Sequence, residues 1–310
     1  MITRQEYGEF VWIDLMSPTH DEIRSIMEEF SVDPLIVDEL SVPSVRNAVD
    51  ARDDYFYLVL HFPSFNTSEK MDFNRVSTTS LELDFIVGKK WIITTRYESA
   101  DPLHRFSKLF ETETMLNKND ISKHAGIAFY HMLNELYKSL YDELTHISSR
   151  LDYAEERIFS GEEKKMVIVL SKISRDILNY VQALDGHDEM LRSLETPGVA
   201  LFGYEYARSV RSIVGEYSRL ANAIKSSKAS VVELRETNNS LLTTKQNEIT
   251  KIFTIMAFVT FPLSLFASLF GMNTVTTPIL GHKWDFWIII GIMFSAAVLF
   301  FSYFKYKKWL

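Results

Sequence analysis

The chain has 310 residues, and its 41 acidic residues outnumber its 33 Lys and Arg residues, for a formal net charge of −8. The excess of acid belongs to the first 244 residues, because the last 66 contain six Lys and only two acids, Glu248 and Asp285. An acidic body of this kind argues against a nucleic-acid-binding protein, which needs a basic face. The absence of cysteine excludes disulfides, thiol catalysis and cysteine-ligated zinc.

Residues 1–118 predict a small cytosolic α/β domain. Aromatic and β-branched runs predict strands at 10–15 and 55–62, and a β-hairpin at 80–95 that turns at Gly88-Lys89-Lys90. Two short helices are expected between these strands. Thr19 and Glu22 form the capping-box pattern of a helix that continues to Phe30, and Asp33-Pro34 begins a second helix that ends near Leu40.

Residues 119–246 predict a helical stalk. A stripe of apolar residues at intervals of three or four indicates one long helix, which Ser160-Gly161 ends. We expect a second helix from Glu162 to about Leu194, ended by Thr196-Pro197-Gly198, and a third that starts near Tyr204. The stripe of the first helix comprises Leu136, Leu140, Leu144, Ile147, Leu151, Ala154 and Ile158.

The third helix is expected to continue to Phe270, which gives it a length of roughly 100 Å at about 1.5 Å per residue. Its section from Asn238 to Asn247 is polar on most faces, as in a helix that is solvated or lines water. Both a stalk that becomes a pore-lining helix and a solvated linker fit this pattern.

Residues 247–310 predict a transmembrane domain with two spans. The first span covers about 249–270, a loop covers 271–283, the second span covers about 284–304, and a basic tail follows. Lysines flank the first span on its N-terminal side and follow the second, whereas the loop holds only Lys283. The positive-inside rule therefore puts both termini in the cytoplasm. The N-terminus has no apolar signal segment, so we expect a multi-pass protein of the plasma or inner membrane.

One face of the first span is made mainly of small or polar residues. Because their spacing is three or four throughout, they share one side of the helix. Small residues at this spacing are typical of close helix packing in membranes, and polar ones of a wet pore. The residues alone leave both interpretations open. The face comprises Asn247, Thr250, Thr254, Ala257, Phe261, Ser264, Ser268 and Gly271.

Taken together, these features resemble the CorA family of divalent-cation, chiefly magnesium, transporters. The first span contains Pro262 and ends in Gly271-Met272-Asn273, a short loop and a second span follow, and the chain closes with Lys-Tyr-Lys-Lys-Trp-Leu at 305–310. The tripeptide is specific because of its place after the first of two C-terminal spans, behind a long helix and an acidic domain. The resemblance covers essentially the whole chain.

The resemblance implies a funnel-shaped homopentamer whose five first spans line a pore. Gly271, Met272 and Asn273 match the selectivity signature at the outer mouth, and Asn247 matches the polar position at the inner mouth. Phe253 and Phe261 match bulky constriction residues, and Thr250 and Ser264 match other pore positions. Together with Ala257 and Ser268 of the small and polar face, these residues are the expected pore lining.

The resemblance further implies passive uptake of a hydrated Mg²⁺ ion, with Co²⁺ or Ni²⁺ as further substrates. The membrane potential would drive it and cytosolic metal would gate it. No covalently bound cofactor is expected, and Gly88-Lys89-Lys90 does not have the form of a nucleotide-binding P-loop, so no enzyme activity is expected. Mg²⁺ would be both substrate and regulatory ligand, with Glu82 and Asp84 as candidate regulatory residues. Solvated surface acids are the alternative for that pair.

The loop departs from the family pattern, because no carboxylate precedes Asp285. Attraction of cations at the outer mouth should therefore be weak. Two alternatives follow for the function. One is a relative that moves zinc or another transition metal, and the other is a membrane-anchored helical scaffold or sensor without transport.

Overall fold

A computed structural model describes residues 2–7, 10–40, 44, 47–63, 80–97, 103, 106–108, 124–272 and 283–307. These residues form two compact units, Met1–Arg235 and Glu236–Leu310. The expected boundary at 118/119, the signature residue Asn273, most of the loop and the end of the tail lie outside the described residues.

A six-stranded mixed sheet organises the first unit, in the order β1-β2-β6-β5-β4-β3. The strands are β1 (Ile2–Tyr7), β2 (Phe10–Met16), β3 (Ala48–Ala51), β4 (Tyr55–Pro63), β5 (Ser80–Gly88) and β6 (Trp91–Arg96). Only the β2–β6 pair is parallel, and the other four pairs are antiparallel. The predicted strands and hairpin are confirmed, whereas β1 and β3 are additions at the two edges.

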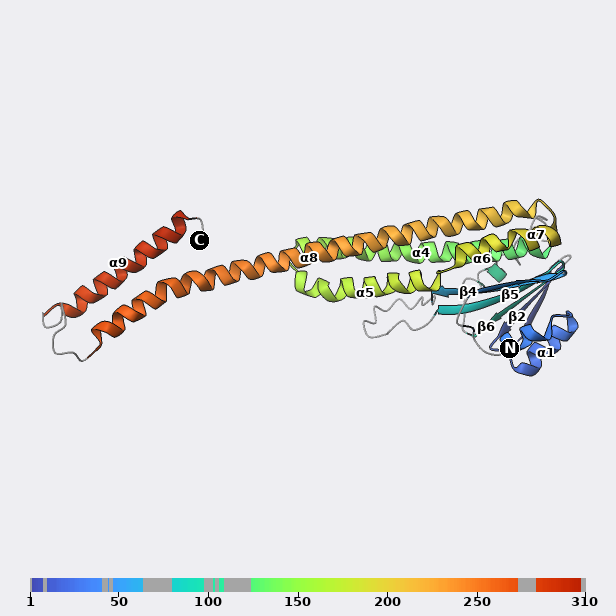
Figure 1. Cartoon of the computed structure of the whole chain (residues 1–310), viewed down its shortest axis with the longest axis horizontal. Coiled ribbons are helices and arrows are strands. Elements are labelled where there is room, and N and C mark those ends of the chain that lie inside the picture. The colour runs from blue at the N-terminus through green and yellow to red at the C-terminus, as the bar shows by residue number, and fades with distance from the viewer. Residues whose placement is uncertain are drawn as a thin grey trace. The chain divides into compact units, whose positions relative to one another are not determined.

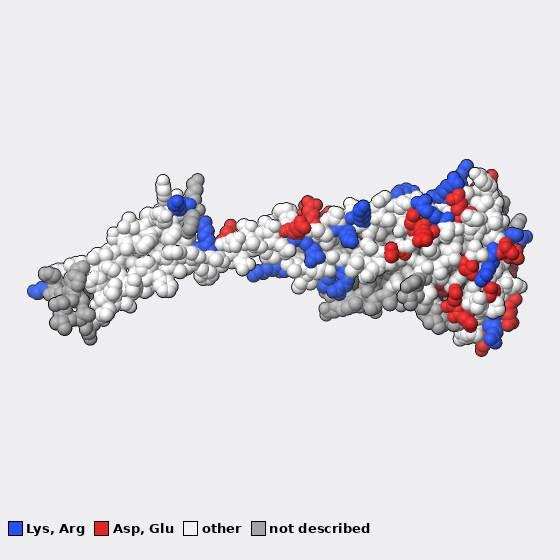
Figure 2. Space-filling model, in the orientation of Figure 1, with Lys and Arg blue, Asp and Glu red and all other residues white. Residues whose placement is uncertain are grey.

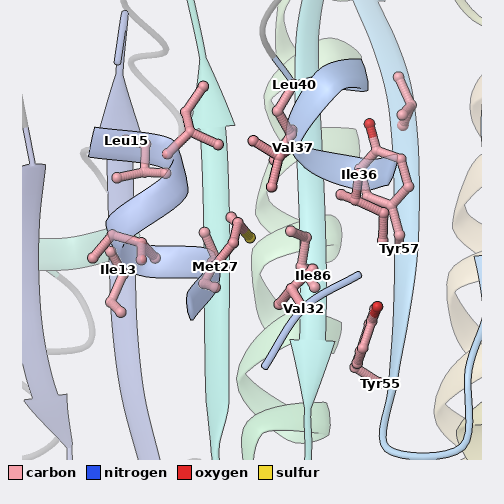
Figure 3. Close-up of a cluster of buried hydrophobic side chains, with 14 residues drawn as sticks. Ile13, Leu15, Met27, Val32, Ile36, Val37, Leu40, Tyr55, Tyr57 and Ile86 are labelled. Carbon is pink, nitrogen blue, oxygen red and sulfur yellow. The ribbon is translucent and has the colours of Figure 1, made fainter. Parts of the chain in front are cut away.

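Two short helices cover one face of the sheet (Figure 1). They are α1 (His20–Glu29), whose Thr19–Glu22 capping box is present, and α2 (Pro34–Glu39), capped by Asp33, as predicted. Their apolar side chains pack on those of β2, β4, β5 and β6 (Figure 3). Figure 3 labels Ile13, Leu15, Met27, Val32, Ile36, Val37, Leu40, Tyr55, Tyr57 and Ile86 of this core.

The long helix α4 (Ala125–Phe159) covers the opposite face of the sheet. Phe129 of α4 meets the rings of Phe56 and Phe85 edge-on, each with ring centroids 5.4 Å apart. Every residue of the predicted apolar stripe of α4 is buried, and Gly161, at φ 95°, follows the helix end. The first unit therefore has three layers, which are the α1–α2 pair, the sheet and α4. Apolar side chains fill the two interfaces between these layers.

The second predicted helix is shorter than expected. It ends at Ala183 as α5 (Glu163–Ala183), and two further helices, α6 (His187–Ser193) and α7 (Glu195–Phe202), follow. Gly186 lies between α5 and α6 at φ 79°, a conformation that glycine adopts without strain. Thr196-Pro197-Gly198 lies inside α7 rather than ending a helix. Pro197 is tolerated there because amide groups in a first helical turn have no partner within the helix.

Among the described residues, two helices are long and apolar enough to cross a membrane. The helix α8 (Tyr206–Phe270) is unbroken over 65 residues, as predicted, and contains Pro262. The helix α9 (Asp285–Tyr306) supplies the second candidate span. Figure 2 shows almost no Lys, Arg, Asp or Glu on the surface of the last part of α8, after Lys251, and of α9, except at their ends.

Candidate pore face and buried acidic pair

The two candidate spans contact each other through a narrow stripe. Ile255 and Val259 of α8 are buried against Phe304 of α9, with Leu263 and Phe300 packed beside them. Ile255, Val259 and Leu263 are four residues apart, so they occupy one side of α8. This stripe fixes which side of the first span faces the second within one chain.

The small and polar face of α8 lies on the other side. With about 100° of rotation per residue, its mean direction is roughly 180° from the Ile255 stripe. Every residue of that face from Asn247 to Gly271 is exposed, including Thr250, Ala257, Ser264 and Ser268. Packing of this face against α9 of the same chain is therefore excluded. The face is therefore available to line a pore, to contact another copy of the chain or to face lipid.

The two predicted constriction residues are large, apolar and exposed. Phe253 and Phe261 have 66% and 78% of their surfaces accessible within the single chain. Full exposure of an aromatic ring toward other side chains or lipid is ordinary in a membrane segment, so exposure alone assigns no role. Their place on the side away from α9 is what agrees with the predicted constriction.

Thr254 adds a chemical detail to this face. Its hydroxyl donates a hydrogen bond to the Thr250 carbonyl, with an oxygen–oxygen distance of 2.8 Å. The proton is therefore directed at the backbone, and the oxygen lone pairs remain to accept hydrogen bonds. Such an oxygen suits a water molecule that is held by a cation, because that water presents its hydrogens outward.

The structure describes only the first two residues of the Gly271-Met272-Asn273 signature. The amide of Gly271 donates to the Ala267 carbonyl at 3.0 Å and so closes the last turn of α8, which ends at Phe270. A β-carbon at Gly271 would lie 3.3 Å from that same carbonyl oxygen, a tight approach that disfavours larger residues. Met272 is exposed, and Asn273 lies outside the described residues.

Glu82 and Asp84 of β5 are buried rather than solvated. They expose only 8% and 1% of their surfaces, so the expectation of solvated surface acids is wrong. The sheet pairing explains this, because Asp84 lies opposite Val59 on β4 and Thr95 on β6, in the middle of the sheet. Burial, and then the charge of Glu82, raises the pKa of the Asp84 carboxyl well above its ordinary value.

Glu82 has partners from two other segments. Its Oε1 accepts from the Ser44 amide at 2.9 Å, and its Oε2 lies 3.7 Å from Nε2 of His61. The two ring nitrogens of His61 face oxygen acceptors, Asn47 Oδ1 at 2.9 Å and the Ser44 carbonyl at 3.0 Å. Both nitrogens must therefore carry hydrogen, which makes the ring a cation beside Glu82. The contact with Glu82 accordingly raises the pKa of His61.

His61 is connected to the helical layer through a second histidine. His187 of α6 donates from Nε2 to the His61 carbonyl at 3.0 Å and accepts at Nδ1 from the Tyr137 hydroxyl at 2.8 Å. Asn47 completes the link by donating to the Asp185 carbonyl at 2.6 Å. Burial lowers the pKa of His187 to about 3, so this ring is neutral. No local sequence pattern indicates this network, because its members are far apart in the chain and have no common spacing.

A resident metal site is not evident in the part of the chain that the structure describes. Within it, no three His, Asp or Glu side chains lie together as metal ligands. The regulatory-metal role of Glu82 and Asp84 therefore stays a prediction, and any such site needs a further ligand from elsewhere.

Comparison with known proteins agrees with this architecture. The chain is 24% identical over 291 residues to the cobalt/magnesium transport protein CorA of Thermotoga maritima, a match that covers 94% of this chain and 80% of the relative. The complete structure of the CorA magnesium transporter from Methanocaldococcus jannaschii superposes with a TM-score of 0.83 at 16% identity, over 97% of this chain and 92% of that one. The cytoplasmic domain of ZntB from Vibrio parahaemolyticus gives 0.60 at 14% identity, over 77% and 89%.

A family model described as CorA-like Mg²⁺ transporter protein matches residues 7–307. Two candidate membrane-spanning helices and relatives of this kind make the protein a membrane protein. The chain therefore belongs to the CorA-like Mg²⁺ transporter family.

Proposed function

We propose that this protein is a passive transporter of hydrated divalent cations, with Mg²⁺ as the main substrate and Co²⁺ or Ni²⁺ as further ones. The observation that carries the proposal is the small and polar face of α8, which is exposed on the side away from α9. Copies of this face arranged around an axis would enclose a polar path through the membrane. A homopentamer with its five first spans innermost fits this arrangement, and five Asn273 side chains would form the ring at its outer mouth.

The chemistry of the proposed path favours a hydrated ion. Mg²⁺ loses its water reluctantly, so neutral amide, hydroxyl and carbonyl oxygens that accept from bound water suit it. Asn247, Thr250, Thr254 and Ser264 supply such oxygens, and Asn273 would add more. Weak sites of this type also let the ion leave, which conduction requires. Rings of Phe253 and Phe261 would close the path by excluding water.

The membrane potential is sufficient as the driving force. Inward movement of a divalent ion releases about 4.6 kcal/mol per 100 mV, at about 2.3 kcal/mol per charge. Cytosolic metal would oppose this flow by gating. The buried Glu82–Asp84 pair, connected through His61 and His187 to the helical layer, is the proposed sensor, completed by a ligand from another subunit.

Uptake into proteoliposomes tests the proposal. Full-length protein is reconstituted under a negative-inside potential, and entry of Mg²⁺, Co²⁺, Ni²⁺ and Zn²⁺ is followed with an internal indicator. Native protein is expected to carry Mg²⁺, and Asn273→Ala is expected to lose ion selectivity or flux. Native mass spectrometry of the same preparation should give five times the chain mass of 36.0 kDa.

A matched pair of substitutions tests whether the small and polar face of α8 lines the path of the ion. Ala257 lies on the small and polar face, whereas Ala267 lies roughly 90° away from the mean direction of that face, and both are exposed. Leucine at 257 should narrow the path and reduce flux by at least about tenfold, whereas Ala267→Leu should leave it nearly unchanged. Equal effects of the two substitutions would mean that this face does not line a path.

Two other results of the uptake experiment would contradict the proposal and favour one of the alternative functions. Passage of Zn²⁺ but not Mg²⁺ would favour the zinc alternative, for which the similarity to the ZntB cytoplasmic domain is the motivating observation. No uptake of any divalent ion, together with an intact oligomer, would favour a membrane-anchored scaffold or sensor.

A further inference from the structure

Three lysines from two helices lie at the same end of the second unit. Packing of Ile255 on Phe304 brings the start of the first span beside the end of the second. Lys251 is one turn before Ile255, and Lys305 and Lys307 are one and three residues after Phe304. All three are exposed, and Lys and Arg atoms gather at this end in Figure 2. We call Lys251, Lys305 and Lys307 the lysine cluster.

The cluster continues the contact between the two helices. Lys251, Ile255, Val259 and Leu263 follow one another at intervals of four, so Lys251 extends the side of α8 that faces α9. On α9, Phe300 and Phe304 face α8, and Lys307 is three residues further along the same side. Along the two helices, the contacting stripes of α8 and α9 therefore change from apolar side chains to lysines at the same height.

This arrangement leaves an excess of positive charge. Glu248, one turn before Lys251, is the one acidic residue that the described chain places at this level, so three ammonium groups stand against one carboxylate. Like charges on facing stripes repel each other, and an anion between them relieves that repulsion. A phosphate group has several oxygen atoms that can each accept a hydrogen bond, so one phosphate can bind several lysines.

Apolar side chains beside the cluster favour a lipid over a free anion. Ile252 follows Lys251, and Phe301 precedes Lys305 by four residues. These two residues expose 53% and 50% of their surfaces. Basic groups between transmembrane helices at a membrane surface are a known setting for acidic headgroups. A free phosphate would use only the lysines, whereas a phospholipid would also lay its acyl chains on these apolar residues.

We propose that the lysine cluster binds the phosphate headgroup of an anionic phospholipid at this end of the two spans. The site is separate from the proposed pore face, because Lys251 shares the side of α8 that packs on α9. The proposal rests on the two spans lying in a membrane and does not depend on ion transport.

Native mass spectrometry of the full-length protein tests the proposal directly. Detergent-solubilised protein is titrated with phosphatidylglycerol or phosphatidylcholine, and bound lipid is counted for the native chain and for the triple variant Lys251→Gln/Lys305→Gln/Lys307→Gln. The native chain should prefer phosphatidylglycerol. The triple variant should lose that preference by about fivefold for each lysine.

A matched triple variant controls for charge alone. Lys225→Gln/Lys228→Gln/Lys283→Gln removes the same charge from exposed lysines outside the cluster and should keep the native preference. An excess of inorganic phosphate should not displace the lipid.

Three outcomes would overturn the proposal. They are unchanged phosphatidylglycerol preference in the cluster variant, an equal loss in the matched variant, and displacement by inorganic phosphate. Because lipid binding is measured without ion flux, these outcomes leave the transport proposal untouched, and failure of transport leaves this one untouched.

Discussion

Individual residues in the first unit are arranged so that two histidines have different protonation states. His61 faces oxygen acceptors at both nitrogens and Glu82 nearby, so it is protonated. His187 donates at one nitrogen and accepts a hydroxyl proton at the other, so it is neutral. The difference arises from hydrogen-bond partners, because both rings are largely shielded from water.

The neutral state of His187 makes stability depend on pH. Burial lowers the pKa of His187 to about 3 in the folded chain, against about 6.5 when unfolded. Below pH 6.5 the unfolded chain binds a proton that the folded chain does not, so stability is full above that value and falls on acidification. The loss from this residue is up to about 1.4 kcal/mol per pH unit until about pH 3.

We expect His187→Gln to lower the melting temperature at pH 7.5 but to flatten its decline between pH 6.5 and 4. Thermal unfolding of the detergent-solubilised full chain measures both effects. His146→Gln, at an exposed position on α4, should keep the native slope. An unchanged slope in His187→Gln would show that another group causes the acid sensitivity.

At the scale of elements, local sequence signals predicted most of the helices and strands. The Thr19–Glu22 capping box, the α4 stripe and the turn at Gly88 each combine several neighbouring residues, and all three are confirmed. The end of α5 was predicted about ten residues too late, because the break at Gly186 was not recognised. The predicted stop at Thr196-Pro197-Gly198 was also wrong, because proline is equally compatible with the first turn of a helix, here α7. The edge strands β1 and β3 are short and their pairing depends on distant strands, so no local pattern announced them.

Two glycines in helical regions should respond oppositely to alanine. Gly186 has φ 79°, where a β-carbon costs about 1 kcal/mol, so Gly186→Ala should lower the melting temperature. Gly215 lies inside α8, and a β-carbon there meets nothing within 4 Å in the single chain. Gly215→Ala should raise the melting temperature, by about 1 kcal/mol of stability, through better helix propensity.

The proposed homopentamer supplies a check on this pair. A stabilised Gly215→Ala chain that no longer assembles would reveal that a neighbouring helix approaches this glycine closely. A destabilised Gly215→Ala monomer would contradict the expected gain in helix propensity.

For the whole molecule, the sequence predicted the two spans but could not show which side of α8 packs against the second span. Spacing alone placed Asn247 to Gly271 on one side, and both helix packing and a pore fitted it. The position of α9 decides which side faces the partner helix, and that position depends on Phe300 and Phe304, some 40 residues away in sequence. The network from Glu82 to Tyr137 was out of reach for the same reason, since it joins five segments.

The orientation of the spans remains a prediction that the cysteine-free sequence makes simple to test. Single cysteines are introduced at Thr276, in the loop, and at Lys228, before the first span, in intact cells. A membrane-impermeant maleimide should label Thr276→Cys from outside and Lys228→Cys only after permeabilisation. The reverse pattern would place both termini outside and would contradict the positive-inside assignment.

Pro262 has a mechanical consequence for α8. A proline has no amide hydrogen, so the helix lacks the bond that residue 262 would otherwise donate to the Phe258 carbonyl. The rest of this 65-residue helix has a continuous ladder of such bonds, and a bend is therefore cheapest at this one turn. Ser264 and Ser268 lie beyond it, and Asn247, Thr250 and Ala257 lie before it. The part of the face after Pro262 can thus tilt on a hinge relative to the part before it.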